Sequence, residues 1–396
     1  MLGAIIGDVA GSTYEVDEVL ALKNKTKVSY EQRIKILDRN VPLFKENSSC
    51  TDDTILTSAI AECILKNGNY EDYLREFGKK EVSLGLDIYG RSRFGKGFID
   101  WLNNNRIGES FGNGCAMRIS PIPMYYDNLD DILNETYKST ITSHNHDESI
   151  NATKAVSIAI YMAKHKFSKE DIKNKIEKEC GFNLNFDLED LQRNYKFTSK
   201  AKKSVPQAIY CFIVSNDFED AIRKAISIGG DTDTIAAITG SIAENYYGIP
   251  EKIINEVNKY IPDYIKGIIN RFYLKLEFNN FLKNEQMNDK NFLEYLKNRT
   301  IVTPNTFGKE YYGCFPRLNN GILVGINLLV PEIENKEDLL INIHEYTHAF
   351  DLYKKLNCLY IEDIKELEQH AKVMEKKYLY RWYSYARIDC FIKWKG

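Results

Sequence analysis

Carboxylates and hydroxyls stand together at two places in the sequence, each time directly before an apolar segment. The two motifs are Thr51-Asp52-Asp53-Thr54 and Gly229-Gly230-Asp231-Thr232-Asp233-Thr234. Hard divalent cations such as Mg²⁺ and Mn²⁺ prefer oxygen ligands, and a pair of such ions can activate a water molecule near neutral pH. Helix capping is the other explanation, because Asp and Thr before a helix accept hydrogen bonds from its free N–H groups. The residue types alone leave both explanations open.

A third motif, His344-Glu345-Tyr346-Thr347-His348, points to a different metal. On a helix, the two imidazoles of HExxH lie on one face, where they can bind Zn²⁺ with Glu345 as general base. Glu368 is the predicted third ligand, because its segment resembles the Glu-x-x-Ala of gluzincin metallopeptidases, and Glu366 is a weaker candidate. A surface helix with two polar histidines and a zinc site without proteolytic activity are the alternatives.

The acidic motifs belong to a longer pattern. Five segments occur in order within residues 1–250: Gly3-Ala4-Ile5-Ile6-Gly7-Asp8 with Gly11 and Tyr14-Glu15; Thr51-Asp52-Asp53-Thr54; Gly112-Asn113-Gly114-Cys115-Ala116-Met117-Arg118; Ser143-His144-Asn145-His146; and Gly229 to Thr234. In this set the chain resembles the ADP-ribosylglycohydrolase family, which includes dinitrogenase reductase-activating glycohydrolase. The resemblance implies an all-α domain and a binuclear Mg²⁺ or Mn²⁺ centre. The ligands that it implies are Thr51, Asp52, Asp53, Asp231, Asp233 and Thr234.

The same resemblance suggests roles for other residues. Glu15 corresponds to the family's mobile glutamate near the metal site, and Glu15, Asp231 and Asp233 are the candidates for the catalytic base. The predicted substrate-binding residues are Gly112, Asn113, Gly114, Arg118 and His144. Glycines allow a phosphate or ribose to approach backbone amides, and arginine can pair with a phosphate. Each of these roles has an alternative. Glu15 could be a surface carboxylate, and Gly112-Asn113-Gly114 a plain turn. Arg118 could pair with a structural carboxylate, and His144 could be a structural histidine.

Helices must position most of these residues. Apolar segments at 54–65, 152–164 and 235–247 predict buried helices, the last ending at Gly248. Residues 278–300 are polar and charged, residues 301–331 predict short strands with a hairpin near Asn319-Asn320, and helices return from residue 335. We therefore expect an all-α ADP-ribosylglycohydrolase domain (1–277), a linker (278–300) and a small α+β zincin-like domain (301–396).

Composition excludes several classes of function. The net charge of −3 gives no general basic field for nucleic acid, and no apolar run has the length of a membrane span. Eight cysteines without a CxxC pair or a disulfide framework predict a cytoplasmic protein.

Together these features predict a hydrolase that removes ADP-ribose from a modified target. The expected substrate is an ADP-ribosylated protein, a nucleic acid or a small ADP-ribose derivative. The alternatives are a zinc peptidase directed to ADP-ribosylated proteins by a non-catalytic domain, and a module that only binds ADP-ribose. The complete set of metal ligands argues against a module that only binds.

Overall fold

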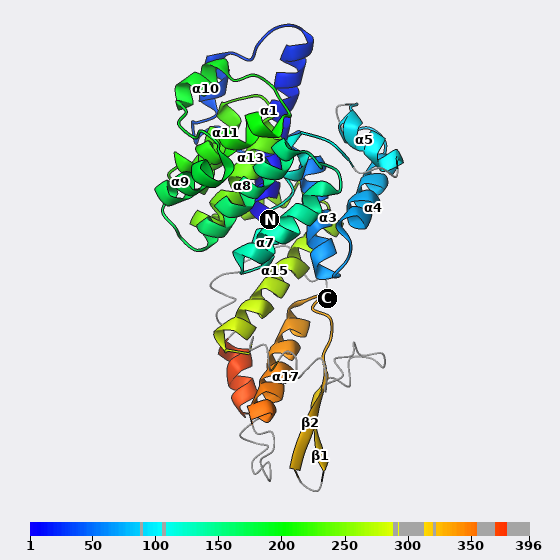
Figure 1. The fold of residues 1–396 in the computed structure, drawn as a ribbon. Helices are drawn as coiled ribbons and strands as arrows, with labels where there is room; N and C mark the ends of the chain where they lie inside the picture. Colours follow the sequence, from blue (N-terminus) through cyan, green and yellow to red (C-terminus); the bar gives the residue numbers. More distant parts are fainter. Residues whose placement is uncertain are drawn as a thin grey trace. The chain divides into compact units, whose positions relative to one another are not determined.

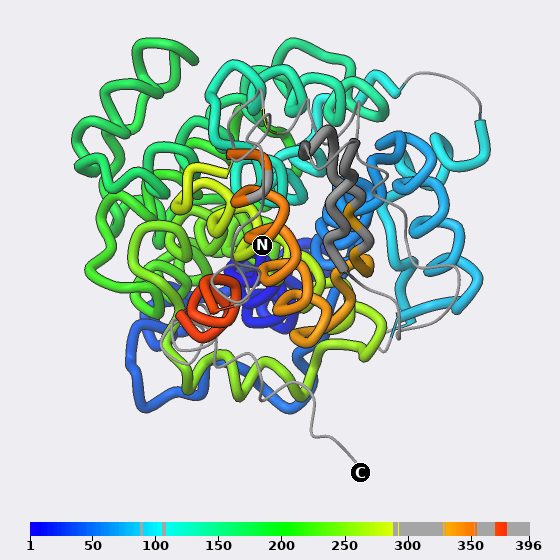
Figure 2. Tube along the Cα trace, turned by 90° about the horizontal axis from the view of Figure 1, so that it is seen from below, coloured from blue at the N-terminus to red at the C-terminus, as the bar shows by residue number. Residues whose placement is uncertain are grey.

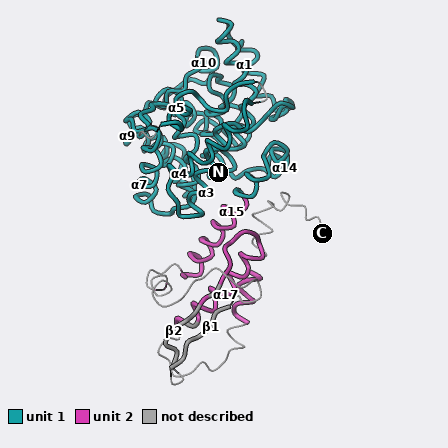
Figure 3. Tube along the Cα trace, turned by 90° about the vertical axis from the view of Figure 1, so that its right-hand side faces the viewer, with its two compact units in different colours: residues 1–269 teal, residues 270–396 magenta. Residues whose placement is uncertain are grey.

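A computed structural model describes residues 1–87, 90–104, 108–287, 292, 313–319, 322–354 and 369–377. The chain divides into two compact units, residues 1–269 and residues 270–396 (Figure 3). No helix in the described ranges is long and apolar enough to cross a membrane.

The regular elements described in unit 1 are helices (Figure 1). They are α1 (Leu2–Lys23), α2 (Tyr30–Lys35), α3 (Asp52–Leu65), α4 (Tyr70–Ser83), α5 (Lys96–Asn103), the short 3-10 helix η1 (Asn113–Cys115), α6 (Pro121–Tyr125), α7 (Leu129–Ile141), α8 (Asp147–Lys164), α9 (Lys169–Cys180), α10 (Leu188–Asn194), α11 (Ala201–Ile213), α12 (Phe218–Ser227), α13 (Thr232–Tyr247) and α14 (Glu251–Val257), followed by the start of α15 (Asp263–Asn284). The three helices predicted in this region are therefore confirmed. Each begins two to five residues earlier than its apolar segment (52, 147 and 232 against 54, 152 and 235), because its polar first turn belongs to the helix.

The packing of α1 against α13 is the feature that organises unit 1. Residues 2–13 of α1 are buried all round, and its first residue lies inside the helical unit (Figure 2). Gly3, Gly7 and Gly11 lie four residues apart, on one face of the helix. A Cβ atom at Gly7 would lie 2.1 Å from the carbonyl oxygen of Ala236, and one at Gly3 would lie 2.2 Å from that of Gly240. The glycines therefore allow the two backbones to touch.

Unit 2 combines helices with a hairpin. After the end of α15, it contains strands β1 (Gly313–Asn319) and β2 (Ile322–Leu329), helix α17 (Lys336–Lys354) and a helical segment at 369–377. The strands pair antiparallel, with a register irregularity between Arg317 and Leu318, so the hairpin predicted from the sequence is confirmed. The remaining residues of the predicted strand region, 301–312, lie outside the described ranges.

The core of unit 2 draws on residues from distant parts of the chain. Phe278 and Phe281 of α15 are buried in one cluster with Ile343 and Phe350 of α17 and with Met374. Phe278 and Phe281 stand in the segment predicted as a linker, where the sequence is polar overall. Their spacing of three residues places both on the buried side of the last turns of α15.

Candidate functional site

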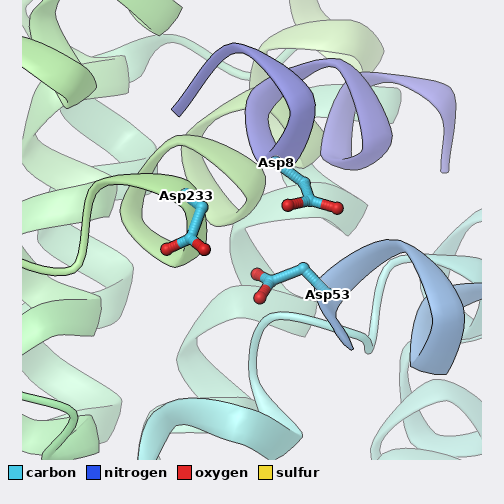
Figure 4. Close-up of side chains that lie close together, drawn as sticks. All are labelled: Asp8, Asp53 and Asp233. Carbon is cyan, nitrogen blue, oxygen red and sulfur yellow. The ribbon is translucent and has the colours of Figure 1, made fainter. Parts of the chain in front are cut away.

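Buried carboxylates from three helices meet at one place in unit 1. Oxygen atoms of Asp8 on α1, Asp53 on α3 and Asp233 on α13 all lie within 4.8 Å of one another. Figure 4 shows the three carboxylates directed toward a common space. A second set of Glu15, Asp231 and Asp233 satisfies the same distance limit, so the two sets share Asp233. The fold thus brings together the two acidic motifs, which are separated by almost 180 residues.

The helix starts explain how these side chains are held. Thr51 is the N-cap of α3, and its Oγ1 accepts a hydrogen bond of 3.3 Å from the backbone N–H of Asp53. Asp231 is the N-cap of α13, preceded by Gly229 and Gly230 with φ of +76° and +78°. Glycine populates this left-handed region without the steric penalty of a side chain. Thr51 therefore caps α3, whereas the side chain of Asp231 makes no capping hydrogen bond to α13, so capping by the side chain explains the first motif only.

Asp8 is a site residue that the sequence reasoning did not assign. Its carboxylate accepts hydrogen bonds from the backbone N–H and the hydroxyl of Thr51, at 2.9 and 2.7 Å. It also accepts from the backbone N–H of Thr54, at 3.1 Å, and from the Thr54 hydroxyl. Oδ2 accepts three of these hydrogen bonds and Oδ1 accepts one, so Oδ1 keeps an acceptor position. Asp8 thus fixes the start of α3 relative to α1. The signal for it was its place between Gly7 and Gly11, on the helix that packs closest to α13.

Asp53 has capacity left for a ligand. Its Oδ2 accepts a hydrogen bond of 3.2 Å from the Thr234 hydroxyl, and the oxygen of the Thr51 hydroxyl, which donates to Asp8, lies 3.5 Å away. Its Oδ1 is buried and has no hydrogen-bond partner among the described residues. A buried, unsatisfied carboxylate oxygen is costly unless something else neutralises it. Together with the surrounding oxygen donors, this atom fits a hard divalent cation such as Mg²⁺ or Mn²⁺.

The electrostatics of the cluster agree with a cation site. Burial raises the pKa of Asp8 and of Asp231 to about 6. Burial raises the pKa of Asp52 to about 8, with the nearby charge of Asp8 as a further cause. Burial and neighbouring carboxylates also raise the pKa values of Asp53 and Asp233 well above the usual range. A bound cation would reverse this preference, since it favours the charged forms.

Glu15 lies at the edge of the cluster and is paired with a cation. Its Oε2 accepts a hydrogen bond of 2.7 Å from Nη1 of Arg91. Nε of the same arginine donates to Asp87 at 2.9 Å. The sequence analysis did not single out Arg91. The arginine connects Glu15 to a loop that lines the cavity described next.

A cavity of about 610 Å³ opens beside the acidic cluster. Its lining includes all the predicted metal and substrate residues of unit 1: Glu15, Thr51, Asp52, Asp53, Gly112, Asn113, Gly114, Arg118, His144, Asp231, Asp233 and Thr234. The fold thus gathers every predicted site residue of this unit around one space. Phe94, Phe98, Phe111 and Phe197 add aromatic surface to the same lining.

Several of these residues have contacts that the sequence did not predict. The side-chain amide of Asn113 donates a 2.7 Å hydrogen bond to Oδ2 of Asp231, so this residue holds a carboxylate as well as a tight turn. Nη2 of Arg118 donates to the hydroxyl of Ser143 at 2.8 Å, and that hydroxyl lies 2.7 Å from Nδ1 of His144. Burial lowers the pKa of Arg118 to about 10 and that of His144 well below its usual value.

Arg118 is also incompletely satisfied. The side chain is fully buried, and its Nε and Nη1 have no hydrogen-bond partner in the part of the chain that the structure describes. Neither of the two partners considered from the sequence, a phosphate and a structural carboxylate, corresponds to the serine contact observed. A buried guanidinium requires acceptors for its N–H groups, so these donors suit an anion or a polar ligand.

In unit 2, the HExxH motif lies on α17, as predicted. Nε2 of His344 lies 3.1 Å from Nε2 of His348. Glu345 lies on the same helix, between the two histidines. Glu366 and Glu368, the candidates for a third zinc ligand, lie outside the described residues.

Comparison with known proteins identifies the family of unit 1. The model of the ADP-ribosylglycohydrolase family matches residues 1–280 of the 396 in the chain. The chain belongs to this family. It is an ADP-ribosylglycohydrolase, a hydrolase of glycosidic bonds, and the enzyme class predicted from the sequence is confirmed.

Individual relatives are distant. The chain is 24% identical to the ADP-ribosylhydrolase ARH3 of Mus musculus, in a match that covers 63% of this chain and 83% of that protein. It is 21% identical to the ADP-ribosylarginine hydrolase Tri1 of Pseudomonas putida, over 63% of this chain and 70% of that one. A solved structure described as an ADP-ribosylglycohydrolase-related protein complex matches with a TM-score of 0.47 and 21% identity, covering 69% of this chain and 95% of that chain.

The family match does not extend through unit 2. The family model ends at residue 280, so the zincin-like identity predicted for residues 301–396 receives no support from the comparisons. Unit 2 does contain helices and a hairpin, but these elements alone do not establish a peptidase fold.

Proposed function

We propose that the chain removes ADP-ribose from a modified target by hydrolysing the bond at the anomeric carbon of the distal ribose, with two Mg²⁺ or Mn²⁺ ions. The proposed ligands are Thr51, Asp52, Asp53, Asp231, Asp233 and Thr234. The observation that carries the proposal is the pair of carboxylate sets that share Asp233, next to Oδ1 of Asp53, for which the described residues offer no hydrogen-bond donor. Two overlapping sets of oxygen donors suit two adjacent cations better than one.

The chemistry requires stabilisation of positive charge and a proton acceptor. Cleavage of the glycosidic bond builds oxocarbenium character at the ribose, which nearby carboxylates stabilise. When bound, the metal ions would supply Lewis acidity and a water molecule with a lowered pKa. Asp231, Asp233 and Glu15 are the candidates for the group that accepts the proton. The hydrogen bond from Asn113 to Oδ2 of Asp231 fixes the orientation of this carboxylate, and therefore also the direction of its other oxygen, Oδ1.

The cavity beside the cluster fits the rest of the substrate. Its volume of about 610 Å³ lies within the usual range for small-molecule sites. Gly112 and Gly114 allow a phosphate to approach the backbone, and Arg118 offers the N–H groups of Nε and Nη1, which have no acceptor among the described residues. His144 is near both glycines, since a Cβ atom at Gly114 would lie 3.2 Å from its Nε2. We propose that these residues hold the diphosphate and adenosine parts of ADP-ribose.

An ADP-ribosylated protein is the first substrate class to test, because the named relatives include an ADP-ribosylarginine hydrolase. ADP-ribosylated nucleic acid and small ADP-ribose derivatives are the other classes. The experiment measures release of free ADP-ribose from defined conjugates of each class, with Mg²⁺, Mn²⁺ or a chelator present. Release that depends on the metal and on one class of conjugate would support the proposal and identify the target.

Two variants test the metal centre in the same assay. Asp52→Ala or Asp231→Ala leaves two cations with too few anionic ligands, so turnover should be abolished while the fold is retained. Asp72→Ala is a matched control, because Asp72 is an exposed carboxylate in the first turn of α4. Wild-type hydrolysis of the best conjugate by either site variant would show that the two-metal mechanism is wrong.

A zinc peptidase in unit 2 is the second candidate function. It is favoured by the placement of His344, Glu345 and His348 on one helix, with the histidine Nε2 atoms 3.1 Å apart. Glu345→Gln would remove the proposed base and spare the zinc ligands, so it should retain zinc and lose peptide cleavage. Incubation of the wild-type chain and this variant with a mixed peptide library decides the point, since equal cleavage by both would exclude the mechanism. If peptide cleavage is the only activity and Asp231→Ala leaves it intact, unit 1 serves as a targeting domain.

A further inference from the structure

Two glycines stand directly before Asp231, where the chain enters α13. Gly229 and Gly230 have φ of +76° and +78°, and with Ile228 they form a segment that we call the glycine loop. Because glycine has no side chain to restrict it, such a pair can adopt many backbone conformations in isolation. The residue types of the loop therefore do not fix the direction in which Asp231 is presented, and contacts from other segments must do so.

A buried ion pair between α1 and α2 lies at this loop. Nε and Nη2 of Arg33 donate hydrogen bonds of 3.0 and 2.7 Å to Oε1 of Glu18. Both residues are buried, with exposed fractions of 5% for Arg33 and 7% for Glu18. The loss of hydration offsets much of the attraction between two buried charges, so such a pair contributes little net stability. Stability alone is therefore a weak explanation for this pair.

Each residue of the glycine loop is in contact with the pair. Nη1 of Arg33 donates a hydrogen bond of 2.9 Å to the carbonyl oxygen of Ile228. The guanidinium lies against Gly229, where a Cβ atom would be only 2.3 Å from its Cζ. The carboxylate of Glu18 accepts a hydrogen bond from the backbone N–H of Gly230. The two charged side chains thus hold three successive residues of the backbone in one conformation.

The same guanidinium also holds the end of α10. Its Nη1 donates to the carbonyl oxygens of Gln192 and Tyr195, at 3.1 and 3.2 Å. Arginine presents five N–H groups in a rigid planar fork, whereas lysine presents three on a flexible chain. An Arg33→Lys change would therefore keep a positive charge opposite Glu18 but could not reproduce this set of contacts.

The spacing of acidic residues on α1 connects the pair to the cluster. Asp8 and Glu15 are seven residues apart and Glu18 follows three residues later, so the three side chains lie along one face of the helix. Asp8 and Glu15 supply oxygen atoms to the two carboxylate sets. Glu18 instead contacts the loop that leads to Asp231. One face of α1 thus carries both oxygen donors of the cluster and a support for its neighbouring motif.

We infer that the ion pair of Glu18 and Arg33 positions Asp231 for cation binding by holding the glycine loop in one conformation. Both are positioning residues, because neither belongs to the described lining of the cavity beside the acidic cluster. The inference rests on the proposed two-metal function and adds a device that sets the affinity of that site for cations. Loss of a residue that orients a metal ligand typically weakens metal binding by about 10–100-fold. A pair that only stabilises the fold is the alternative.

The experiment compares two arginine variants of the full chain after removal of metals. Arg33→Lys is the test, and Arg223→Lys is the matched control. Arg223 is also buried, with an exposed fraction of 3%, and it also pairs with a glutamate, Glu219. Like Arg33, it donates to three backbone carbonyl groups, which here belong to Ile36, Asp38 and Val41. None of these partners belongs to the glycine loop or to the acidic motifs.

Three quantities are measured for each variant. Hydrogen exchange of the backbone amides of residues 228–234 in the metal-free protein reports on the loop itself. Calorimetric titration gives the affinity for Mg²⁺, and denaturant unfolding gives the global stability. Glu18→Gln is a second test variant, which keeps the size of the side chain and an acceptor for Gly230 but removes the charge opposite Arg33.

Arg33→Lys should exchange faster at residues 228–234 than the wild type and the control, and should bind Mg²⁺ about 10–100-fold more weakly. The Mg²⁺ concentration for half-maximal release of ADP-ribose should rise by the same factor. Glu18→Gln should show smaller changes in the same direction. Arg223→Lys should keep the wild-type Mg²⁺ affinity and the wild-type exchange of the loop, whatever its global stability.

Two results would overturn the inference. Wild-type exchange and wild-type Mg²⁺ affinity in Arg33→Lys and Glu18→Gln would show that the pair does not position the loop. Equal weakening of Mg²⁺ binding in Arg33→Lys and Arg223→Lys would reduce the effect to a general loss of stability. Absence of Mg²⁺-dependent ADP-ribose release by the wild type would instead reject the proposed function, and exchange in the metal-free protein would still decide whether the pair holds the loop.

Discussion

The Asp8→Asn variant tests two roles of Asp8 separately, because it keeps the hydrogen bonds that position α3 and removes the negative charge from the cluster. In the wild type, the hydroxyl of Thr51 donates to Asp8 and accepts from the backbone N–H of Asp53, which leaves one lone pair for a metal ion. An amide at position 8 can keep its oxygen toward the two backbone N–H groups. Its NH₂ group then faces the Thr51 hydroxyl, which must accept instead of donate. The number of hydrogen bonds is preserved, but the Thr51 oxygen loses a lone pair and its fixed orientation.

Two effects on free energy follow, with opposite signs. Loss of an orienting group weakens metal binding by about 10–100-fold, or about 1–3 kcal/mol. In the metal-free protein, the raised pKa of Asp8, about 6 against an ordinary 3.8, corresponds to a penalty of about 3 kcal/mol for its charged form. Weaker hydrogen bonds to a neutral amide offset about 1–2 kcal/mol of that gain. The metal-free variant should therefore be at least as stable as the wild type.

The assay is thermal unfolding with and without saturating Mg²⁺, together with titration of Mg²⁺ by calorimetry. The variant should unfold at or above the wild-type temperature without metal, and below it with metal. Asp17→Asn is the control, because Asp17 is an exposed carboxylate on the same helix. Equal destabilisation in both conditions would make Asp8 a purely structural residue. Wild-type Mg²⁺ affinity would refute the argument from the Thr51 hydroxyl.

Three further changes test other parts of the structure. Glu15→Gln should lower kcat more than ADP-ribose affinity, because the charge matters most as the oxocarbenium forms, and equal kcat values would make Glu15 a bystander. Gly7→Ala should destabilise unit 1 by about 1–3 kcal/mol or more in denaturant unfolding, since its Cβ would meet a backbone oxygen at 2.1 Å, whereas Gly97→Ala enters open space and should not. The metal-free protein should lose stability as pH rises from about 4 to about 8, because the unfolded chain releases the protons of Asp231 and Asp52 near pH 4, whereas burial raises the pKa of these carboxyls in the folded protein to about 6 and about 8. Thermal unfolding across this range should show that loss without Mg²⁺ and a smaller one with it.

The acidic motifs could be found in the sequence because metal ligands of one type stand next to each other in the chain. Thr51 to Thr54 and Asp231 to Thr234 each occupy a helix start, where both capping and metal binding select the same residues. Asp8 could not be found in this way, since its role depends on which helix α1 packs against. The glycine spacing predicts a close helix contact but does not name the partner.

Contacts between residues far apart in the sequence account for the other features of the site that the sequence did not predict. The hydrogen bond from Asn113 to Asp231 spans 118 positions, and that from Arg91 to Glu15 spans 76. Residue type suggests that such groups will find partners, but only the fold decides which. In unit 2, HExxH defines a helix face by local spacing alone, while the contact of Glu375 with His344 needs a second helix whose start and direction the sequence did not reveal.

Because the three carboxylates come from three different helices, cation binding is coupled to the folding of unit 1. Asp8, Asp53 and Asp233 come from α1, α3 and α13, so repulsion between their charged forms opposes the packing of these helices, including the close glycine contacts between α1 and α13. A cation that binds only the folded arrangement removes this repulsion and stabilises the fold, by about 2.7 kcal/mol when its concentration is a hundred times its dissociation constant. The proposed metal centre would then also have a structural role, because bound cations would hold the three helices in place. The raised pKa values follow from the same arrangement, since protons neutralise the cluster when cations do not.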